Sequence, residues 1–149
     1  MNLTLLRPVQ GGRVSQWFGG NPAMYVRFGL PGHNGIDYAV PVGTPVTAAH
    51  DGWLEVPPVD PDGYGRYVIV RGQGLYTLYA HLSDVPGLQP GAFVHAGNRI
   101  GYSGTTGNST GPHLHFGLRL TKQDYQSQPI SRLARPVAVQ ELDHARLAL

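Results

Sequence analysis

The chain has 149 residues, no cysteine and a formal net charge of +2 at pH 7. This length fits one domain with an ordinary core, while the lack of cysteine excludes disulfides, thiolate metal sites and thiol nucleophiles. The mild charge forms no basic stripe of the kind that binds nucleic acid, and no apolar run approaches the length of a membrane span. Because 21 glycines and 13 prolines leave little room for long helices, we expect an all-β fold.

The N-terminal region predicts short strands followed by a long loop. Strands are expected within residues 1–10 and at residues 13–18. The segment 19–32 combines glycines, prolines and aromatic residues, and long loops in compact domains are usually functional. The first residues lack the charged start and long apolar stretch of a secretory signal.

A histidine and an aspartate follow this loop closely. His33 and Asp37 are four residues apart, a spacing that would suit one face of a helix. The neighbouring proline and glycines disfavour a helix here. We therefore expect His33 at the end of the loop and Asp37 on the short strand that follows.

The middle of the chain predicts a hairpin flanked by loops. Residues 66–71 and 76–81 have strand patterns and are joined by a turn that contains two glycines. His81 ends the second strand, and alternation predicts that it shares a face with Thr77 and Tyr79. Further short strands are expected at residues 34–40, 46–55, 93–94 and 99–102, and loops at residues 57–65, 83–91 and 103–112.

The segment 113–120 carries the most informative pattern. Its even-numbered positions are leucine or phenylalanine, which predicts a strand with one face in the core. The other face presents His113 and His115, about 7 Å apart along the strand at the usual rise per residue. A half-buried strand gains no stability from such a pair, whereas imidazole is the commonest neutral ligand of divalent transition metals.

Partners for these histidines exist elsewhere in the chain. His33, Asp37 and His115 would supply two imidazoles and one carboxylate, and three protein ligands with an open fourth position are typical of catalytic zinc. Such a site lowers the pKa of water to about 7. His81 and His113 would remain as unligated imidazoles, whose unperturbed pKa of about 6.5 suits general acid–base work.

Taken together, these motifs resemble the lysostaphin-like (LytM-like) zinc endopeptidases, which cut peptidoglycan peptides. The match rests on His33-x-x-x-Asp37, on His81 within residues 79–82, and on His113-x-His115 within residues 109–116. Further matching stretches lie at residues 37–46, 48–52 and 101–107. The resemblance covers roughly residues 11 to 120, in the order of the family.

The resemblance implies both a fold and a site. It implies a curved antiparallel sheet of duplicated-hybrid-motif type, with smaller strands and four loops, near residues 19–32, 57–65, 83–91 and 103–112, around a narrow groove. It implies that His33, Asp37 and His115 bind Zn²⁺, while His81 and His113 activate water and stabilise the oxyanion on the substrate carbonyl. Trp17, Tyr25 and Tyr64 are candidates to line the groove.

The resemblance also implies where the protein acts. We expect hydrolysis of cross-bridge or stem peptides in the extracytoplasmic cell wall, with no nucleic acid as partner and no membrane insertion. Without a signal in this chain, we expect delivery by a phage, release by lysis, or excision from a longer protein, and a larger phage or cell-wall assembly is a candidate partner. We expect residues 1–128 to form the single peptidase domain and residues 129–149 a tail that is helical or flexible.

Other readings of the same motifs are weaker. Residues 91–101 resemble half of a biotinyl or lipoyl carrier, but the only lysine, Lys122, lies outside any suitable hairpin. A phosphoryl-carrying sugar-transport domain also uses paired histidines, yet it has no need of His33 and Asp37. The glycine-rich loop 103–112 lacks the lysine and the following helix of a P-loop. A non-catalytic peptidoglycan-binding or phage structural module would not need an intact set of ligands.

The remaining histidines carry no partner pattern. His50, His95 and His144 are expected at the surface or in ordinary hydrogen bonds. Arg119 falls on the histidine face of its strand, where it could meet a substrate carboxylate or simply be solvated.

Overall fold

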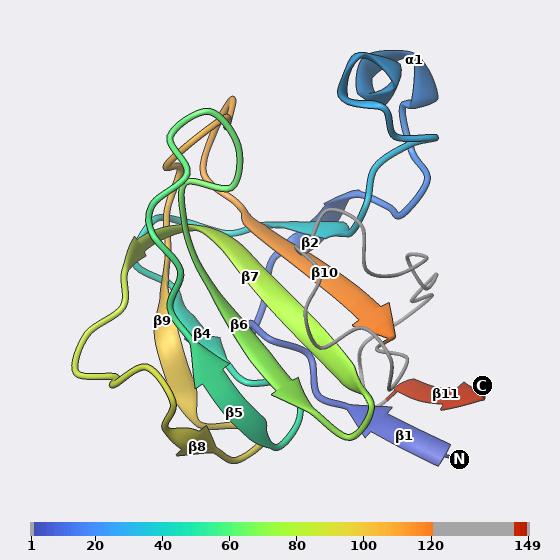
Figure 1. The fold of residues 1–149 in the computed structure, drawn as a ribbon. Coiled ribbons are helices and arrows are strands. Elements are labelled where there is room, and N and C mark those ends of the chain that lie inside the picture. Colours follow the sequence, from blue (N-terminus) through green and yellow to red (C-terminus); the bar gives the residue numbers. More distant parts are fainter. Residues whose placement is uncertain (1, 121–144, 149) are drawn as a thin grey trace.

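The computed structural model describes residues 2–120 and 145–148, and these residues form mostly antiparallel β-structure (Figure 1). The strands are β1 (Asn2–Leu5), β2 (Arg13–Gln16), β3 (Ile36–Ala39), β4 (Pro45–Thr47), β5 (Gly52–Glu55), β6 (Arg66–Gly72), β7 (Leu75–Asp84), β8 (Phe93–Val94), β9 (Arg99–Ser103), β10 (Leu114–Leu120) and β11 (Ala145–Ala148). One helical turn, α1 (Pro22–Tyr25), leads directly into a 3-10 turn, η1 (Val26–Phe28). The expected all-β fold is confirmed.

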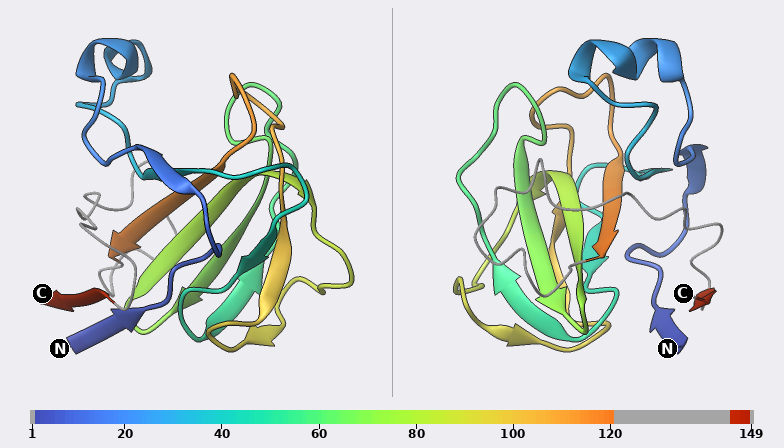
Figure 2. Two further views of the ribbon diagram at one scale, coloured as in Figure 1. Left: turned by 180° about the vertical axis from the view of Figure 1, so that it is seen from behind. Right: turned by 45° about the vertical axis from the view of Figure 1, so that its right-hand side comes forward.

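The strands form one large sheet and one small one. Their order in the large sheet is β2-β3-β10-β7-β6-β5-β8, and β9 joins it by pairing with β7 and with β4. The sheet curves strongly, so that β4 and β9 come to lie beside the central strands (Figure 2). The small sheet pairs β1 with β11 and so brings the two ends of the chain together.

The predicted hairpin is present as β6 and β7. Its turn consists of Gln73 and Gly74, whose φ angles of 56° and 76° are both positive. Two consecutive positive φ values are typical of the turn that matches the twist of a two-residue hairpin. The hairpin places β7 at the centre of the sheet, between β6 and β10.

Apolar side chains pack on both faces of the sheet. The larger cluster includes Tyr79 and Phe116, whose rings meet edge to face with centroids 5.3 Å apart. Burial of a side chain of this size stabilises the fold by about 1.5–3 kcal/mol. The smaller cluster lies on the other face of β7 and contains Leu78 and Ala80. As predicted for β10, its leucines and phenylalanine enter the large cluster, so His115 faces the opposite side, opposite Ala80.

A bulge in β7 changes the direction of one predicted site residue. Val68 pairs with Tyr79 and Arg66 pairs with Leu82, so β7 contains one residue more than β6 between these pairs. Within this stretch His81 has a φ of 61°, a left-handed backbone conformation that is uncommon for a residue with a side chain. Bulges of this kind re-aim side chains next to functional sites.

The bulge makes one expectation about His81 wrong. Regular alternation would place it beside Tyr79 in the large cluster, on the face of Thr77. Its ring instead lies 4.6 Å from the ring of His113 and 6.0 Å from that of His115, measured between centroids. The extra residue therefore moves His81 to the histidine face of the sheet.

Two other segments differ from the expectations. The segment 19–32 is not wholly irregular, because it contains α1 and η1, and Pro22 stands in the first turn of α1, where proline needs no hydrogen-bonded N–H. Of the tail expected to be helical or flexible, residues 145–148 form strand β11, since they pair with β1. Residues 129–144 and 149 lie outside the described residues. In the described part of the chain, no helix is long and apolar enough to cross a membrane.

Candidate metal centre and cleft

The pairing of β3 with β10 brings two of the predicted ligands together. Asp37 and His115 are direct partners in this antiparallel ladder, and directly opposed residues have Cβ atoms about 4.5–5.5 Å apart. His33 precedes β3 by three residues and is held by two backbone hydrogen bonds: its N–H donates to the carbonyl of Gly20, and its carbonyl accepts from the N–H of Gly19. Side chains far apart in the sequence therefore come together at one point.

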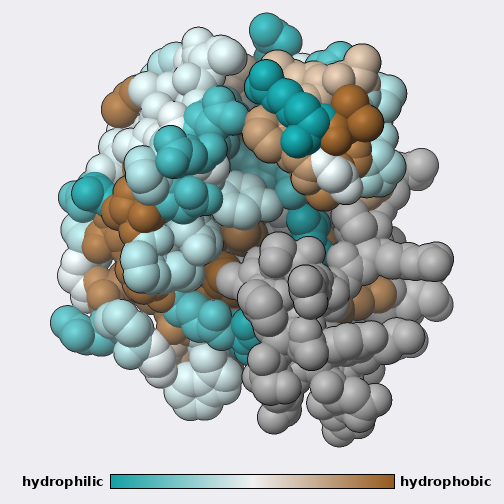
Figure 3. Space-filling model, turned by 45° about the horizontal axis from the view of Figure 1, so that its top comes forward, coloured by the Kyte–Doolittle hydropathy of each residue, from teal (hydrophilic) through white to brown (hydrophobic). Residues whose placement is uncertain are grey.

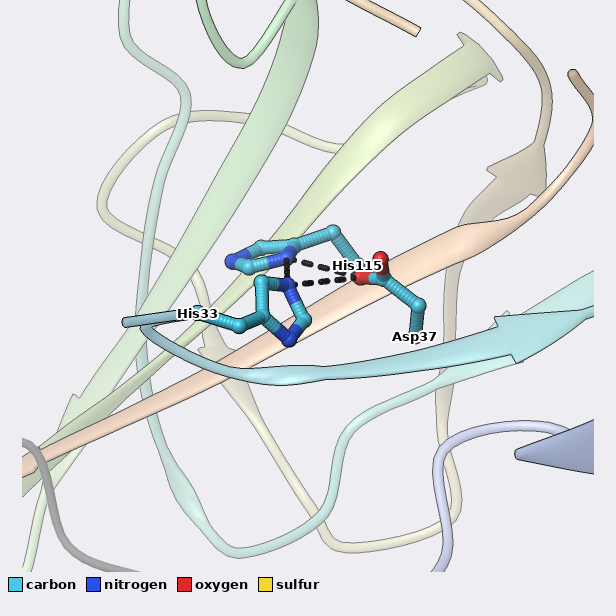
Figure 4. Close-up of side chains that lie close together, drawn as sticks. All are labelled: His33, Asp37 and His115. Carbon is cyan, nitrogen blue, oxygen red and sulfur yellow. Dashed lines mark hydrogen bonds and ion pairs between the residues drawn. The ribbon is translucent and has the colours of Figure 1, made fainter. Parts of the chain in front are cut away.

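Three polar atoms converge there (Figure 4). His33 Nε2 lies 3.0 Å from His115 Nδ1 and 3.1 Å from Asp37 Oδ1, and His115 Nδ1 lies 2.9 Å from the same carboxylate oxygen. All three side chains are buried, with residue exposures of 2%, 8% and 4% for His33, Asp37 and His115. They form a His/Asp group with the compactness needed to hold one metal ion.

The protons available to this group are too few for its acceptors. His33 Nδ1 donates to the carbonyl of Trp17 at 3.2 Å, so a neutral His33 presents a lone pair at Nε2. Asp37 offers only lone pairs, and His115 can place at most one proton between the three atoms. An excess of lone pairs at one buried point is the condition that a cation satisfies.

The dimensions also fit zinc. Tetrahedral ligands about 2.0 Å from Zn²⁺ would be about 3.3 Å apart, close to the separations found here. The ring of His115 is tightly cradled: a Cβ added at Gly35 would lie 2.7 Å from its Cε1, and its buried Nε2 has no hydrogen-bond partner among the described residues. The residues present therefore fit a zinc ion at this site.

Electrostatics keep the group in the form that binds a cation. Burial by itself would raise the pKa of Asp37, but the hydrogen bonds and charges of His115 and His33 hold that pKa well below its ordinary value. Burial lowers the pKa of His115 and outweighs the opposing effect of Asp37. At neutral pH the group therefore contains a carboxylate and neutral imidazole at His115.

His81 and His113 stand beside this group with a common orientation. His81 Nδ1 donates to the carbonyl of Thr106 at 2.7 Å, and His113 Nδ1 donates to the carbonyl of Gly111 at 2.8 Å. Each ring therefore presents Nε2 away from its anchor, and His113 Nε2 lies 3.9 Å from Asp37 Oδ2. Burial lowers the pKa of His81 to about 4, so its Nε2 carries a lone pair at neutral pH.

The group lies in a cleft of about 320 Å³. Figure 3 looks toward this end of the molecule, where hydrophilic side chains gather around a hollow. Three of the four expected loops contribute lining residues, 19–32, 57–65 and 103–112, whereas the lining contains no residue of 83–91. Tyr25 and Tyr64 line the cleft as expected; Trp17 is not part of the lining and contributes its carbonyl to His33 instead.

The other histidines and Arg119 are separate from this group. His50 is buried and hydrogen-bonded to the carbonyl of Asp51 and to Thr77, while His95 is exposed near the carboxylate of Asp51. Arg119 donates to the carbonyl of Asn34 at 3.0 Å. His144 lies outside the described residues.

Sequence reasoning missed the groups that orient the site. The carbonyls of Trp17, Thr106 and Gly111 each fix one histidine ring, and a carbonyl leaves no mark in the pattern of side chains. In the sequence, Gly35 is one of the glycines that disfavour a helix after His33, whereas in the structure its lack of a side chain makes room for His115. The left-handed conformation of His81 has no sequence signal of its own.

Known proteins are similar to this chain in sequence and in fold. A model of Peptidase family M23 matches residues 31–129. The DD-carboxypeptidase/endopeptidase Mpg of Neisseria meningitidis serogroup B is 38% identical over 153 residues, covering 91% of this chain and 34% of the relative. The peptidoglycan DD-endopeptidase ShyA of Vibrio cholerae is 45% identical over 87 residues, 58% of this chain and 20% of the relative. The chain thus spans about a third or less of these curated relatives.

Solved structures of other peptidases have a similar fold. A zinc-containing peptidase from Vibrio cholerae superimposes with a TM-score of 0.72 at 29% identity, covering 99% of this chain and 41% of that one. Lysostaphin from Staphylococcus simulans has a TM-score of 0.66 at 28% identity, covering 84% and 47%. The catalytic domain of the prophage-encoded M23 protein EnpA from Enterococcus faecalis has a TM-score of 0.69 at 27% identity, covering 90% and 93%.

Proposed function

This chain belongs to peptidase family M23, and on that premise we propose that it is a zinc-dependent endopeptidase that hydrolyses amide bonds in peptidoglycan peptides. The resemblance to lysostaphin-like peptidases is confirmed by this membership and by the fold. The observation that carries the proposal is the convergence of His33 Nε2, Asp37 Oδ1 and His115 Nδ1 within 3.1 Å of one another.

In this proposal, His33, Asp37 and His115 hold the metal. Three ligands of this kind leave a fourth position open to the cleft, as catalytic zinc sites do and structural sites do not. A bound zinc ion supplies a Lewis acid for the scissile carbonyl and acidifies water. The hydrogen bond from His33 to the carbonyl of Trp17 fixes the ring for ligation, which is the usual role of such an outer partner.

In this proposal, His81 and His113 act as the general base and general acid. With Nδ1 anchored on a carbonyl, each neutral ring accepts a proton only at Nε2. One of them takes the proton that water loses as its oxygen bonds to the amide carbon. The resulting imidazolium donates a hydrogen bond to the developing oxyanion or returns the proton to the nitrogen of the leaving amine as the C–N bond breaks. Tyr25 and Tyr64, which both line the cleft, are available to contact the bound peptide.

The site of action follows from the substrate. We propose that the enzyme acts on the extracytoplasmic cell wall, as the names of its relatives suggest. Of delivery by a phage, release by lysis and excision from a longer protein, we propose delivery by a phage, with a larger phage or cell-wall assembly as partner; the prophage-encoded M23 protein among the similar structures supports this choice.

Digestion of purified cell walls tests the proposal. Zinc-loaded protein is incubated with peptidoglycan of several bridge chemistries, and the released peptides are identified by mass spectrometry. We expect new amino termini from one class of amide bond, and none after removal of zinc with a chelator. Release of sugars without new amino termini, or equal activity without zinc, would contradict the proposal.

A further inference from the structure

The bulge in β7 leaves His81 dependent on a neighbouring loop. Its ring nitrogen Nδ1 donates to one acceptor in the described part of the chain, the carbonyl of Thr106. Thr106 belongs to the loop 103–112 and does not line the cleft, to which this loop contributes residues 108–110. The carbonyl of Thr106 thus reaches the site through its hydrogen bond with His81.

The side chain of Thr106 fixes the position of its own carbonyl. Its hydroxyl donates to the carbonyl of Leu82 at 2.8 Å and accepts from the backbone N–H of Arg66 at 3.0 Å. Leu82 and Arg66 are paired residues of β7 and β6 at the bulge. One hydroxyl thus ties the loop to both strands beside His81.

Two glycines allow the loops 57–65 and 103–112 to approach each other closely at Thr106. A Cβ at Gly65 would overlap the backbone and hydroxyl of Thr106, and a Cβ at Gly107 would overlap Gly65. Both glycines also have positive φ angles, of 65° and 71°. The loops 57–65 and 103–112 are therefore in close contact at Thr106, and the carbonyl that meets His81 has little freedom to move.

From this geometry we propose that Thr106 is a positioning residue for His81. Its hydroxyl, held between Leu82 and Arg66, directs its carbonyl at His81 Nδ1 and so keeps the lone pair of Nε2 facing the cleft. The proposal rests on the proposed function, in which His81 Nε2 exchanges the proton. A side chain that fills the same space without a hydroxyl would leave the fold in place and release the ring.

The test replaces Thr106 with valine and with serine. Thr47→Val is the matched control, because Thr47 also donates to a backbone carbonyl, that of Pro8, outside the cleft. In zinc-loaded protein labelled with ¹⁵N, the ring-nitrogen shifts of His81 report which nitrogen carries the proton. We expect the Nδ1–H form alone in the wild type, Thr106→Ser and Thr47→Val, and a mixture of both forms in Thr106→Val.

Kinetics provide the second measurement. We expect Thr106→Val to lower kcat about tenfold to a hundredfold, with KM and zinc content unchanged, and Thr106→Ser to restore most of it. If Thr106→Val does not fold, Thr106→Ala removes the same hydroxyl. An unchanged His81 tautomer in the valine or alanine variant, or a serine variant as impaired as valine, would overturn the proposal. If the wild type releases no peptide, the proposed function fails, while the tautomer comparison still decides the role of Thr106.

Discussion

Buried histidines lie on opposite faces of strand β7, His50 on the core face and the site histidines on the cleft face, and the two environments have opposite hydrogen-bond balances. On the core face, His50 Nδ1 donates to the carbonyl of Asp51 and its Nε2 lies 3.0 Å from the hydroxyl of Thr77. That hydroxyl also meets the hydroxyl of Tyr79, which accepts from the N–H of Ala49. Every polar atom named in this network has a partner.

On the cleft face, hydrogen-bond acceptors outnumber donors. When both imidazoles are neutral, the three meeting atoms of His33, Asp37 and His115 share at most one proton, and His115 Nε2 is buried without a hydrogen-bond partner among the described residues. His50 and His33 are equally buried, at 2% exposure. Burial of a histidine is therefore no sign of function in this protein, whereas a deficit of protons at a shared point is.

Removal of a ligand should give the largest difference between the two faces. We expect His115→Ala to lose zinc completely, because two remaining ligands do not hold the ion, and to lose the thermal stabilisation that zinc provides. His50→Ala should keep one zinc per chain. Metal analysis by mass spectrometry and calorimetry with and without zinc measure both effects. Retention of zinc by His115→Ala would show that the ion binds elsewhere.

Substitution of a histidine that does not bind the ion should separate chemistry from binding. We expect His81→Ala to keep its zinc and to lose about 10²–10⁴-fold in kcat, the usual range for a general acid or base. The measurement is the initial rate of peptide release at saturating substrate, alongside metal analysis of the same preparation. A rate equal to that of the wild type would remove His81 from the mechanism.

Sequence patterns predicted most features of the cleft face. The alternation of leucine with histidine in residues 113–120 predicted β10 correctly, because a period of two leaves one choice of buried face. Three glycine- and proline-rich loops around the cleft were also identified by composition. The assignment of His33, Asp37 and His115 as a set came from spacing and resemblance, and the pairing of Asp37 with His115 supports it physically.

What the sequence could not predict depends on backbone geometry. Regular alternation predicted His81 on the face of Thr77 and Tyr79, which the structure shows to be the core face, and only the extra residue in β7 moves it to the cleft. The loop 83–91 resembles the other loops in composition but does not reach the cleft, since tertiary arrangement decides which loops meet. Strand β11 is fixed by its pairing with β1, a contact between residues at opposite ends of the chain.

A steric change tests how closely the cleft face depends on its backbone. A Cβ at Gly35 would lie 2.5 Å from the carbonyl oxygen of Phe116 and 2.7 Å from His115 Cε1. We expect Gly35→Ala to shift the ring of His115 and to weaken zinc binding about tenfold to a hundredfold, as displaced outer partners of metal ligands do. Competition with a zinc-binding dye measures the affinity.

The control for this change is Gly117, which lies on β10 two residues after His115. A Cβ at Gly117 would make only ordinary van der Waals contact, 3.6 Å from the Cβ of Leu78 and 3.8 Å from His115 Nε2. Gly117→Ala should therefore bind zinc as the wild type does. Equal loss of affinity in both variants would mean that general loosening of the sheet, and not displacement of His115, is responsible.

The smallest expected effect is on the pH dependence of stability. In zinc-free protein, a histidine from each face should contribute to it. Burial lowers the pKa of His50, and it lowers the pKa of His81 to about 4. Since both values lie below that of the unfolded chain, about 6.5, the unfolded state binds protons first. These histidines therefore contribute their full stabilisation above pH 6.5, and the free energy of unfolding falls as the pH decreases from 6.5 toward the lowered folded pKa, by at most about 1.4 kcal/mol per pH unit for each histidine.

Variants assign this pH dependence to the two faces. Each of His50→Gln and His81→Gln should reduce the slope of unfolding free energy against pH in zinc-free protein, measured by urea titrations between pH 4.5 and 7, by about one proton or less. Asp37 contributes only at lower pH, because its lowered pKa makes its stabilisation disappear below the range of an ordinary carboxyl. Zinc should leave the contribution of His50 intact, since its network does not touch the proposed ligands. A His50→Gln variant with the full wild-type slope would mean that folding does not change the pKa of His50, so that burial on the core face does not favour its neutral form.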